Sequence, residues 1–173
     1  MRRINLAAII LLAVSTALTF TSLVAKADLP DGKNAGLASA SVGPGGVAIG
    51  IEYENGYNHT YGVGAYFHLS PNDKAVGSNG LTTVGVFVRP HFSRQAWDLY
   101  FTPGVGLMFV TPGNNDSNQA LLGPSFGVGL LYEFNPKVSV GVDDTTYAGW
   151  IGGSDPYRGV IGSDLAAKVR VIF

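Results

Sequence analysis

The segment that decides the fold closes the chain: Leu165-Ala166-Ala167-Lys168-Val169-Arg170-Val171-Ile172-Phe173. Successive side chains of a β-strand point to opposite faces, so the apolar residues of one face are Leu165, Ala167, Val169, Val171 and Phe173. The other face carries Ala166, Lys168, Arg170 and Ile172. A strand with an apolar face toward lipid and a polar face toward a barrel interior is typical of a transmembrane β-strand. We expect Phe173 to anchor this strand at the membrane interface.

The beginning of the chain predicts export. Arg2 and Arg3 precede an apolar stretch from Ile4 to Val24, and Ala25-Lys26-Ala27 supplies small residues at the expected cleavage positions. This pattern indicates a secretory signal peptide over residues 1–27, removed before Asp28. The alternative is an uncleaved membrane anchor, because the stretch is almost long enough to span a bilayer. The Ser and Thr residues inside it and the Ala-x-Ala end favour cleavage.

Composition limits the function classes. The chain has no cysteine, which excludes a lipoprotein anchor, disulfides and thiolate metal sites. Without residues 1–27 it keeps 8 basic and 12 acidic residues, a formal charge of −4, which argues against nucleic-acid binding. No apolar run after residue 27 approaches the ~20 residues of a helical span. A mature protein that is integral to a membrane must therefore be a closed barrel, and residues 28–173 form one domain.

Alternation at period two predicts strands along the whole mature chain. Seven strands are predicted at about 44–54, 57–69, 81–92, 96–110, 120–134, 137–149 and 160–173. An eighth candidate, Asn34 to Gly43, has fewer large apolar residues.

The connections between the predicted strands are of two kinds. Asn55-Gly56 signals a two-residue hairpin, and Ser93-Arg94-Gln95 and Asn135-Pro136-Lys137 are equally tight.

Longer polar stretches separate these short turns: Ser70–Gly80, Thr111–Gln119 and Ile151–Gly159. Short turns that alternate with long loops are typical of an outer-membrane barrel, with the turns periplasmic and the loops extracellular. The connection at Gly43-Pro44-Gly45-Gly46 is unusually short for an external one.

The two faces of the predicted strands differ in kind. One carries large apolar side chains such as Ile51, Val86, Leu107 and Val128, whereas the other is built from glycines, His68, His91 and charges. Glycines and ion pairs make a poor soluble core because they bury little apolar area. They suit the narrow interior of an eight-stranded membrane barrel. A membrane barrel is therefore favoured over a soluble, lipocalin-like one.

Aromatic residues gather at the strand ends, which predicts two interfacial belts. The belt beside the short turns and the C-terminus is predicted to contain Tyr53, Tyr57, Phe92, Trp97, Tyr132, Phe134 and Phe173. The belt beside the long loops is predicted to contain Phe67, Phe109, Tyr147 and Trp150.

Three segments carry a family resemblance: Asp98-Leu99-Tyr100-Phe101-Thr102-Pro103-Gly104-Val105-Gly106, Gly127-Val128-Gly129-Leu130-Leu131-Tyr132-Glu133-Phe134-Asn135-Pro136, and Val169-Arg170-Val171-Ile172-Phe173. With these, the chain resembles the OmpA/OmpX/opacity-type small outer-membrane barrels. The resemblance implies an eight-stranded antiparallel barrel that is inserted by the barrel-assembly machinery, with Val169, Val171 and Phe173 as the insertion signal. It implies no single activity, since relatives are structural proteins, adhesins and immune-evasion factors. We expect no peptidoglycan-binding domain after Phe173.

Inward charges are the first candidate site. Those predicted to share the lumen are Glu52, Glu54, Arg89, Asp98, Glu133, Asp143, Lys168 and Arg170. Because isolated buried charges are costly, we expect them to pair with one another. They form either a structural salt-bridge plug, which we favour, or an ion path.

The other candidates are a strand end and two loops. His68 and Ser70 share a face, so the imidazole could activate the hydroxyl, as in the His-x-Ser arrangement of lipid A deacylases. That family places its motif near the C-terminal end, and here Pro71 follows at a loop entrance, so a polar strand end is favoured. Asn114–Asn118 and Gly152–Asp155 could chelate calcium, but ordinary solvated loops are favoured.

The sequence thus predicts an all-β, eight-stranded antiparallel transmembrane barrel in the bacterial outer membrane. We expect a non-enzymatic structural or surface-interaction role, with no catalytic residue, metal or cofactor. The expected partners are outer-membrane lipids, the assembly machinery and an extracellular or host partner at loops 70–80, 111–119 and 151–159. A lipid-modifying hydrolase that uses His68 and Ser70, or a narrow low-conductance pore, is the alternative.

Overall fold

The computed structural model describes residues 32–43, 46–58, 60–72, 77–113, 117–154 and 158–173. All regular structure within these ranges is β. The strands are β1 (Asn34–Gly43), β2 (Gly46–Gly56), β3 (Tyr61–Ser70), β4 (Gly80–Arg94), β5 (Trp97–Thr111), β6 (Gln119–Asn135), β7 (Val138–Gly149), β8 (Ile151–Gly152) and β9 (Gly159–Ile172). In the part of the chain that the structure describes, no helix has the length and hydropathy to cross a membrane. The predicted signal peptide, residues 1–27, lies outside the described residues.

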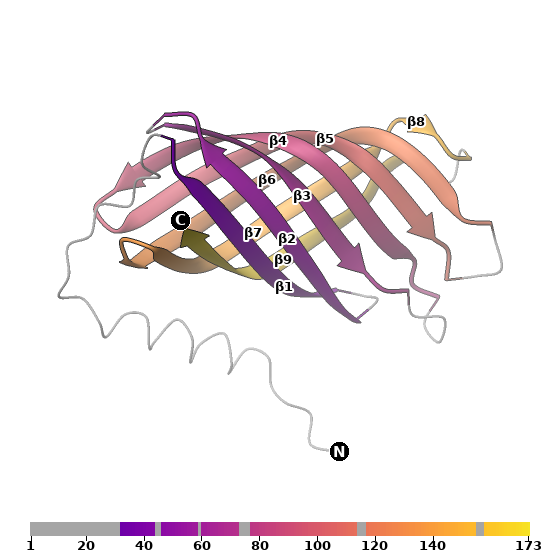
Figure 1. The fold of residues 1–173 in the computed structure, drawn as a ribbon. Helices are drawn as coiled ribbons and strands as arrows, with labels where there is room; N and C mark the ends of the chain where they lie inside the picture. The colour runs from indigo at the N-terminus through magenta and orange to yellow at the C-terminus, as the bar shows by residue number, and fades with distance from the viewer. Residues whose placement is uncertain (1–31, 44–45, 59, 73–76, 114–116, 155–157) are drawn as a thin grey trace, which may run out of the picture.

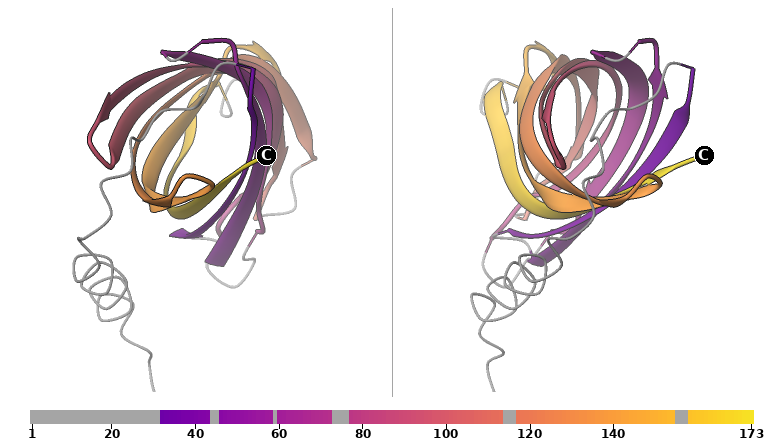
Figure 2. Two further views of the ribbon diagram at one scale, coloured as in Figure 1. Left: turned by 60° about the vertical axis from the view of Figure 1, so that its left-hand side comes forward. Right: turned by 90° about the vertical axis from the view of Figure 1, so that its left-hand side faces the viewer.

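Eight long strands close into an antiparallel barrel, as predicted (Figures 1 and 2). Strands β1 to β7 pair in chain order, and β9 completes the ring between β7 and β1. The segment Asn34–Gly43 is confirmed as a strand, because β1 pairs along its length with β2 and with β9. Closure satisfies both edges of the sheet, which otherwise expose unpaired backbone groups. The two-residue β8 adds a short pairing to β6.

The two ends of the barrel differ. The short turns after β2, β4 and β6, the first strand residue and the C-terminus lie at one end, which we call the turn end (Figure 1). There the backbone groups of Asn34 and Phe173 hydrogen-bond each other, at N···O distances of 3.2 and 2.8 Å. The ends of β3, β5 and β7 that lead into the longer connections lie at the opposite end, which we call the loop end. Gly43 and Gly46 also pair at the loop end.

The predicted hairpin at Asn55-Gly56 is wrong. Strand β2 continues through both residues, which pair with Val63 and Gly62. The turn comes later, where Asn58 Oδ1 accepts hydrogen bonds from the backbone N–H groups of Thr60 and Tyr61 at 2.8 and 2.9 Å. An Asn side chain that mimics a backbone turn can reverse the chain without the Asn-Gly pair. The predicted strand 57–69 accordingly begins at Tyr61.

The other two short turns are tight, as predicted. Arg94 pairs with Trp97, so Gln95 and Ala96 form a two-residue turn in which Gln95 has a φ of 57°. In the third turn, Asn135 Oδ1 accepts hydrogen bonds from the N–H groups of Lys137 (2.9 Å) and Val138 (3.1 Å).

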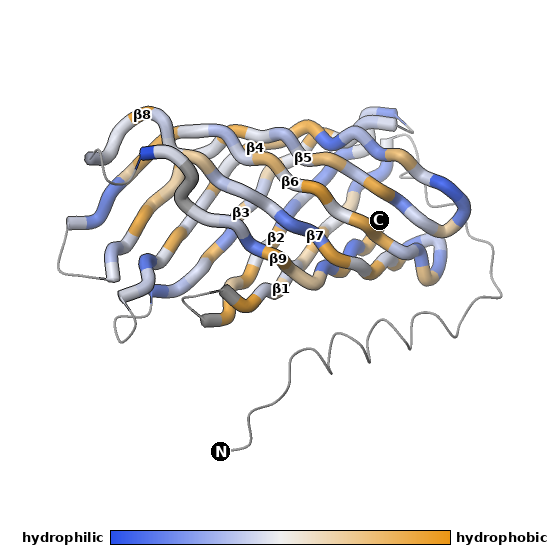
Figure 3. The backbone as a smooth tube through the Cα atoms, turned by 180° about the vertical axis from the view of Figure 1, so that it is seen from behind, coloured by the Kyte–Doolittle hydropathy of each residue, from blue (hydrophilic) through white to orange (hydrophobic). Residues whose placement is uncertain are grey.

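Burial alternates along the strands, so hydrophobic and hydrophilic residues alternate along the tube in Figure 3. On β5, the side chains of Leu99 and Leu107 are exposed on the outside, whereas Asp98 and Tyr100 are fully buried in the lumen. Large apolar side chains are exposed on all eight long strands, and the buried set includes many charged and polar ones. Apolar residues outside and polar residues inside are the reverse of the distribution in a soluble protein, and they are typical of a membrane barrel.

The aromatic residues predicted for the belts lie outside, with one exception. The exposed ones are Tyr53, Tyr57, Phe67, Phe92, Trp97, Phe109, Phe134, Trp150 and Phe173. Tyr132 is half-buried between the rings of Trp97 (centroids 5.0 Å apart) and Phe134 (6.0 Å). The prediction for Tyr147 is wrong, because this side chain is 1% exposed and points into the lumen. Tyr147 follows Asp143 by four residues and therefore shares its inward face.

Candidate functional site in the barrel lumen

Three strands each bring two charged or titratable side chains into the lumen, one pleat apart. Strand β2 supplies Glu52 and Glu54, and β9 supplies Lys168 and Arg170. Strand β4 supplies Arg89 with a residue that the sequence analysis did not place among the luminal charges, His91. An i, i+2 spacing puts both members of each pair on the same face of their strand. The barrel then turns the three faces toward one another.

Arg89 is bonded through each guanidinium nitrogen. Its Nη1 donates to Glu54 Oε2 at 2.7 Å, its Nη2 to Glu52 Oε2 at 2.5 Å, and its Nε to Thr102 Oγ1 at 3.0 Å. The guanidinium carbon lies 4.3 Å from the ring centroid of Phe87 and 4.6 Å from that of Tyr100. Such stacking adds a cation–π attraction to the ion pairs. The guanidinium, 1% exposed, thereby joins β2, β4 and β5.

Lys168 extends the pairing toward β7. Its Nζ lies 2.7 Å from Glu52 Oε1 and 3.0 Å from Asp143 Oδ2. The hydroxyl of Tyr100 donates to the same Asp143 oxygen at 3.2 Å. Glu52 thus binds two cations, one through each carboxylate oxygen.

His91 bridges two carboxylates. Its Nε2 is 2.6 Å from Glu54 Oε1 and its Nδ1 is 2.9 Å from Asp98 Oδ2. An ionised carboxylate only accepts hydrogen bonds, so with Glu54 and Asp98 both ionised the two ring nitrogens carry protons and we expect the ring to be an imidazolium cation. Asp98 also accepts a hydrogen bond from Arg170 Nη1 at 2.5 Å, and Arg170 Nη2 donates to Ser139 Oγ at 3.3 Å.

These contacts form one continuous path, which we call the charge network. It runs through Asp143, Lys168, Glu52, Arg89, Glu54, His91, Asp98 and Arg170. With the imidazolium, its four carboxylates face four cations. Buried charges are tolerated when they are paired and hydrogen-bonded in this way. The eighth predicted luminal charge, Glu133, is buried as well, at 5% exposed.

Inward glycines provide the space for these large side chains. Gly129 pairs with Tyr100 across β5 and β6, and a Cβ on Gly129 would lie 2.1 Å from the Tyr100 ring. A Cβ on Gly62 would lie 1.9 Å from Glu54 Oε1. The inward glycines of the sequence pattern therefore leave room for large luminal side chains on neighbouring strands.

The loop-end half of the lumen is packed differently. A buried cluster, which we call the loop-end cluster, contains Tyr66, Leu81, Phe87, Met108, Val110, Leu121 and Tyr147. This cluster was not predicted from the sequence, in which the inward face was interpreted as glycines, histidines and charges. The signal was available, since Met108 and Val110 share the strand parity of Asp98 and Tyr100 on β5.

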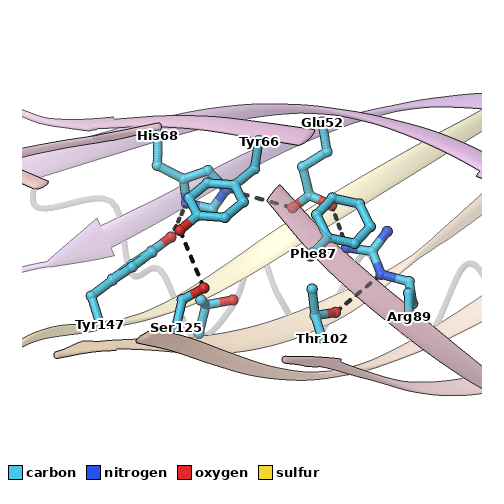
Figure 4. A pocket seen from close by; sticks show the side chains of 9 residues that line it. Glu52, Tyr66, His68, Phe87, Arg89, Thr102, Ser125 and Tyr147 are labelled. Carbon is cyan, nitrogen blue, oxygen red and sulfur yellow. Dashed lines mark hydrogen bonds and ion pairs between the residues drawn. The ribbon is translucent and has the colours of Figure 1, made fainter. Parts of the chain in front are cut away.

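His68 lies between the two halves (Figure 4). Its Nδ1 is 2.5 Å from the Tyr147 hydroxyl, and its Nε2 is 3.5 Å from Glu52 Oε1. Both ring nitrogens are thus directed at residues other than Ser70, which places the imidazole poorly as a general base for that hydroxyl. Beside His68 lies a cavity of about 10 Å³, room for one water molecule.

The loop residues considered for calcium are only partly described. Asn114, Asn115, Asp116 and Asp155 lie outside the described residues. Ser154 donates its backbone N–H to Gln119 Oε1 at 2.9 Å, an ordinary loop contact.

Fold and lumen together define a closed eight-stranded barrel, apolar outside and ionic inside. No family model and no curated protein sequence matches the chain. Among solved structures, it is similar to the N-terminal β-barrel domain of Pseudomonas aeruginosa OprF, with 16% identity, a TM-score of 0.64, and coverage of 83% of this chain and 98% of that one. It is also similar to Neisserial surface protein A, with 18% identity, a TM-score of 0.60, and coverage of 82% and 96%. The chain has the fold of the small outer-membrane β-barrels.

Proposed function

We propose that this chain is an integral protein of the bacterial outer membrane, with a structural role and with its loop end at the cell surface. The observation that carries the proposal is the pairing of an apolar exterior with a lumen filled by ions. Lipid solvates large outward side chains such as Ile51 and Val86, which are 64% and 57% exposed. The fold shared with two outer-membrane barrels supports the same location.

We propose further that the barrel is sealed. The charge network joins β2, β4, β5, β7 and β9 across the turn-end half, and the loop-end cluster fills the other half. Eight strands leave a lumen that side chains can fill. An ion path would need hydrated space along the axis, whereas the cavity beside His68 has a volume of only about 10 Å³. Loops 70–80, 111–119 and 151–159 would then be the parts available to an external partner.

The first test is the mobility of outer-membrane extracts in SDS gels, with and without boiling. A folded barrel resists SDS, so we expect a shift only after heating. A protein that stays in the soluble periplasmic fraction and shows no shift would refute the membrane location.

The second test is conductance in planar bilayers. We expect no single-channel steps for the purified barrel, and no change in lipid A acylation for Ser70→Ala. Regular steps would support a pore instead, and altered acylation would support a hydrolase.

A further inference from the structure

The turn end has a cationic outer surface, although residues 28–173 carry a formal charge of −4. In the part of the chain that the structure describes, the exposed charged side chains at this end are Lys33, Arg94 and Lys137. The acidic residues at the same strand ends are Glu54, Asp98 and Glu133, and all three are buried. Folding therefore separates the two signs, because the lumen takes up the carboxylates and leaves the cations outside. We call the three exposed cations the cationic rim.

Arg94 points outward into the aromatic belt. On β4, His91 points into the lumen, so Phe92 and Arg94, one and three residues later, point outward. Arg94 pairs with Trp97 of β5, which is 41% exposed. Residues that oppose each other directly on antiparallel strands have Cβ atoms about 5 Å apart. Because belt tryptophans lie at the level of the lipid headgroups, the side chain of Arg94 lies at that level too.

The two lysines flank the end of β9. Strand β9 lies between β1 and β7 in the ring, and Lys33 directly precedes β1 whereas Lys137 directly precedes β7. The carbonyl oxygen of Lys137 accepts a hydrogen bond from Ile172 N at 2.8 Å. The next residue, Phe173, is 65% exposed, and its terminal carboxylate lies on the side of the ring opposite Arg94. Each cation of the rim therefore accompanies an exposed aromatic side chain.

Cations beside an aromatic belt match the phosphate groups of lipids. Long Lys and Arg side chains lay their methylenes against apolar surface and keep the charged end in the polar layer. A guanidinium can donate two parallel hydrogen bonds to one phosphate group. An anionic cell-wall polymer is a poorer occupant, because Arg94 points away from the barrel axis and stands beside a lipid-facing indole.

We propose that the cationic rim binds the headgroups of anionic phospholipids in the leaflet at the turn end, with the lipid phosphate as the bound group. The inference rests on the proposed membrane location. Arg94 holds a headgroup beside Trp97, and Lys33 and Lys137 do the same on either side of Phe173. The preference for anionic lipid should fall as the salt concentration rises, because exposed charges are screened.

The two tryptophans of the chain serve as matched reporters, since Trp97 lies at the turn end and Trp150 at the loop end. The full-length barrel is reconstituted as Trp150→Phe or Trp97→Phe, so that each reporter is observed alone. The vesicles mix phosphatidylglycerol with phosphatidylcholine, and one of the two lipids carries brominated chains that quench indole fluorescence. The quenching by each brominated lipid gives the relative affinity of the two lipids beside the reporter. Both leaflets have the same composition, so the direction of insertion does not affect the result.

We expect phosphatidylglycerol to be preferred about fivefold beside Trp97, which corresponds to the attraction of one cation to an anionic surface. Arg94→Gln should remove this preference and leave the value at Trp150 unchanged, whereas Arg94→Lys should keep it. The matched control is Arg158→Gln, which removes an exposed cation at the loop end and should not alter the value at Trp97. Inorganic phosphate at constant ionic strength should not compete.

Equal affinities of the two lipids beside Trp97, or a preference that persists in Arg94→Gln, would overturn the proposal. Loss of the preference to inorganic phosphate would assign the rim to free phosphate and overturn it too. Sedimentation with purified peptidoglycan in the absence of a lipid preference would assign the rim to the cell wall. A heat-dependent gel shift of the same samples separates the two levels: an inserted barrel without a lipid preference refutes the rim alone, whereas failure to insert refutes the proposed function as well.

Discussion

The two halves of the lumen reach complete burial by different means. In the turn-end half, the side chains that fill the space are Arg89, His91 and Arg170, and each is bonded to at least one carboxylate. In the loop-end half, Met108 and Leu121 are equally buried but contribute volume only. The first half depends on the identity and geometry of partners. The second depends on packing, which tolerates substitutions of similar volume.

This difference predicts that removal of a network cation is the most damaging change. Arg89→Met would deprive Glu52 and Glu54 of their shared guanidinium and Thr102 of its donor. We expect a loss of about 3–5 kcal/mol in the free energy of unfolding, because it leaves buried charge incompletely paired. Urea titration in lipid vesicles, followed by the heat-dependent gel shift, measures it.

The matched control for this change is Arg94→Met, at the exposed end of the same strand, which should leave stability nearly unchanged. An Arg89→Met barrel that folds normally and conducts ions would show that the network is a gate and contradict the proposed seal. Lys168→Met should behave as Arg89→Met does.

Removal of volume from the loop-end cluster should cost less. Leu121→Ala opens a cavity at a side chain that is 1% exposed, and we expect a loss of about 3 kcal/mol in the free energy of unfolding. Leu122→Ala is the control, since the neighbouring side chain is 38% exposed on the outside. Equal losses for the two variants in the same urea titration would show that the cluster does not form a packed interior.

Substitution of His91 tests how much the fourth cation of the charge network contributes to the stability of the barrel. His91→Gln replaces an imidazolium with a neutral amide, while Glu54 keeps Arg89 and Asp98 keeps Arg170. We expect a loss of about 2 kcal/mol, the size of a hydrogen bond to a charged group. Nitrogen NMR of the unaltered protein at neutral pH should show protons on both ring nitrogens. A neutral ring would contradict the charge balance.

The smallest expected effect concerns the turns. Among the described residues, a positive φ is taken by glycines, at Gly32, Gly77, Gly152, Gly153 and Gly159, and by one residue of another type, Gln95 in the turn between β4 and β5. A side chain in this conformation costs about 1 kcal/mol, so Gln95→Gly should stabilise the barrel by about that amount. The increase in urea midpoint measures it, and an unchanged or lower midpoint would show that Gln95 has a compensating contact.

Much of the fold could be predicted from alternation alone. Every long strand was predicted, and the inward position of Glu52, Arg89 and Lys168 followed from strand parity. Tyr147 was assigned to the exterior belt because it lies near a strand end. Its even spacing from Asp143 on the same strand indicates instead that its side chain points inward. The error at Asn55-Gly56 arose because this pair is a common hairpin signal, whereas the chain reverses after it, where the Asn58 side chain accepts hydrogen bonds from the backbone of Thr60 and Tyr61.

The sequence by itself determined which side chains face outward and inward, because a strand has a fixed period of two. It therefore determined that the barrel has an apolar exterior and a charged interior. Only the tertiary structure decided which luminal charges meet, since Lys168 and Glu52 lie 116 positions apart and sit on strands that are not adjacent in the ring. Such contacts across the lumen depend on closure, tilt and stagger of the whole sheet, which no single segment encodes.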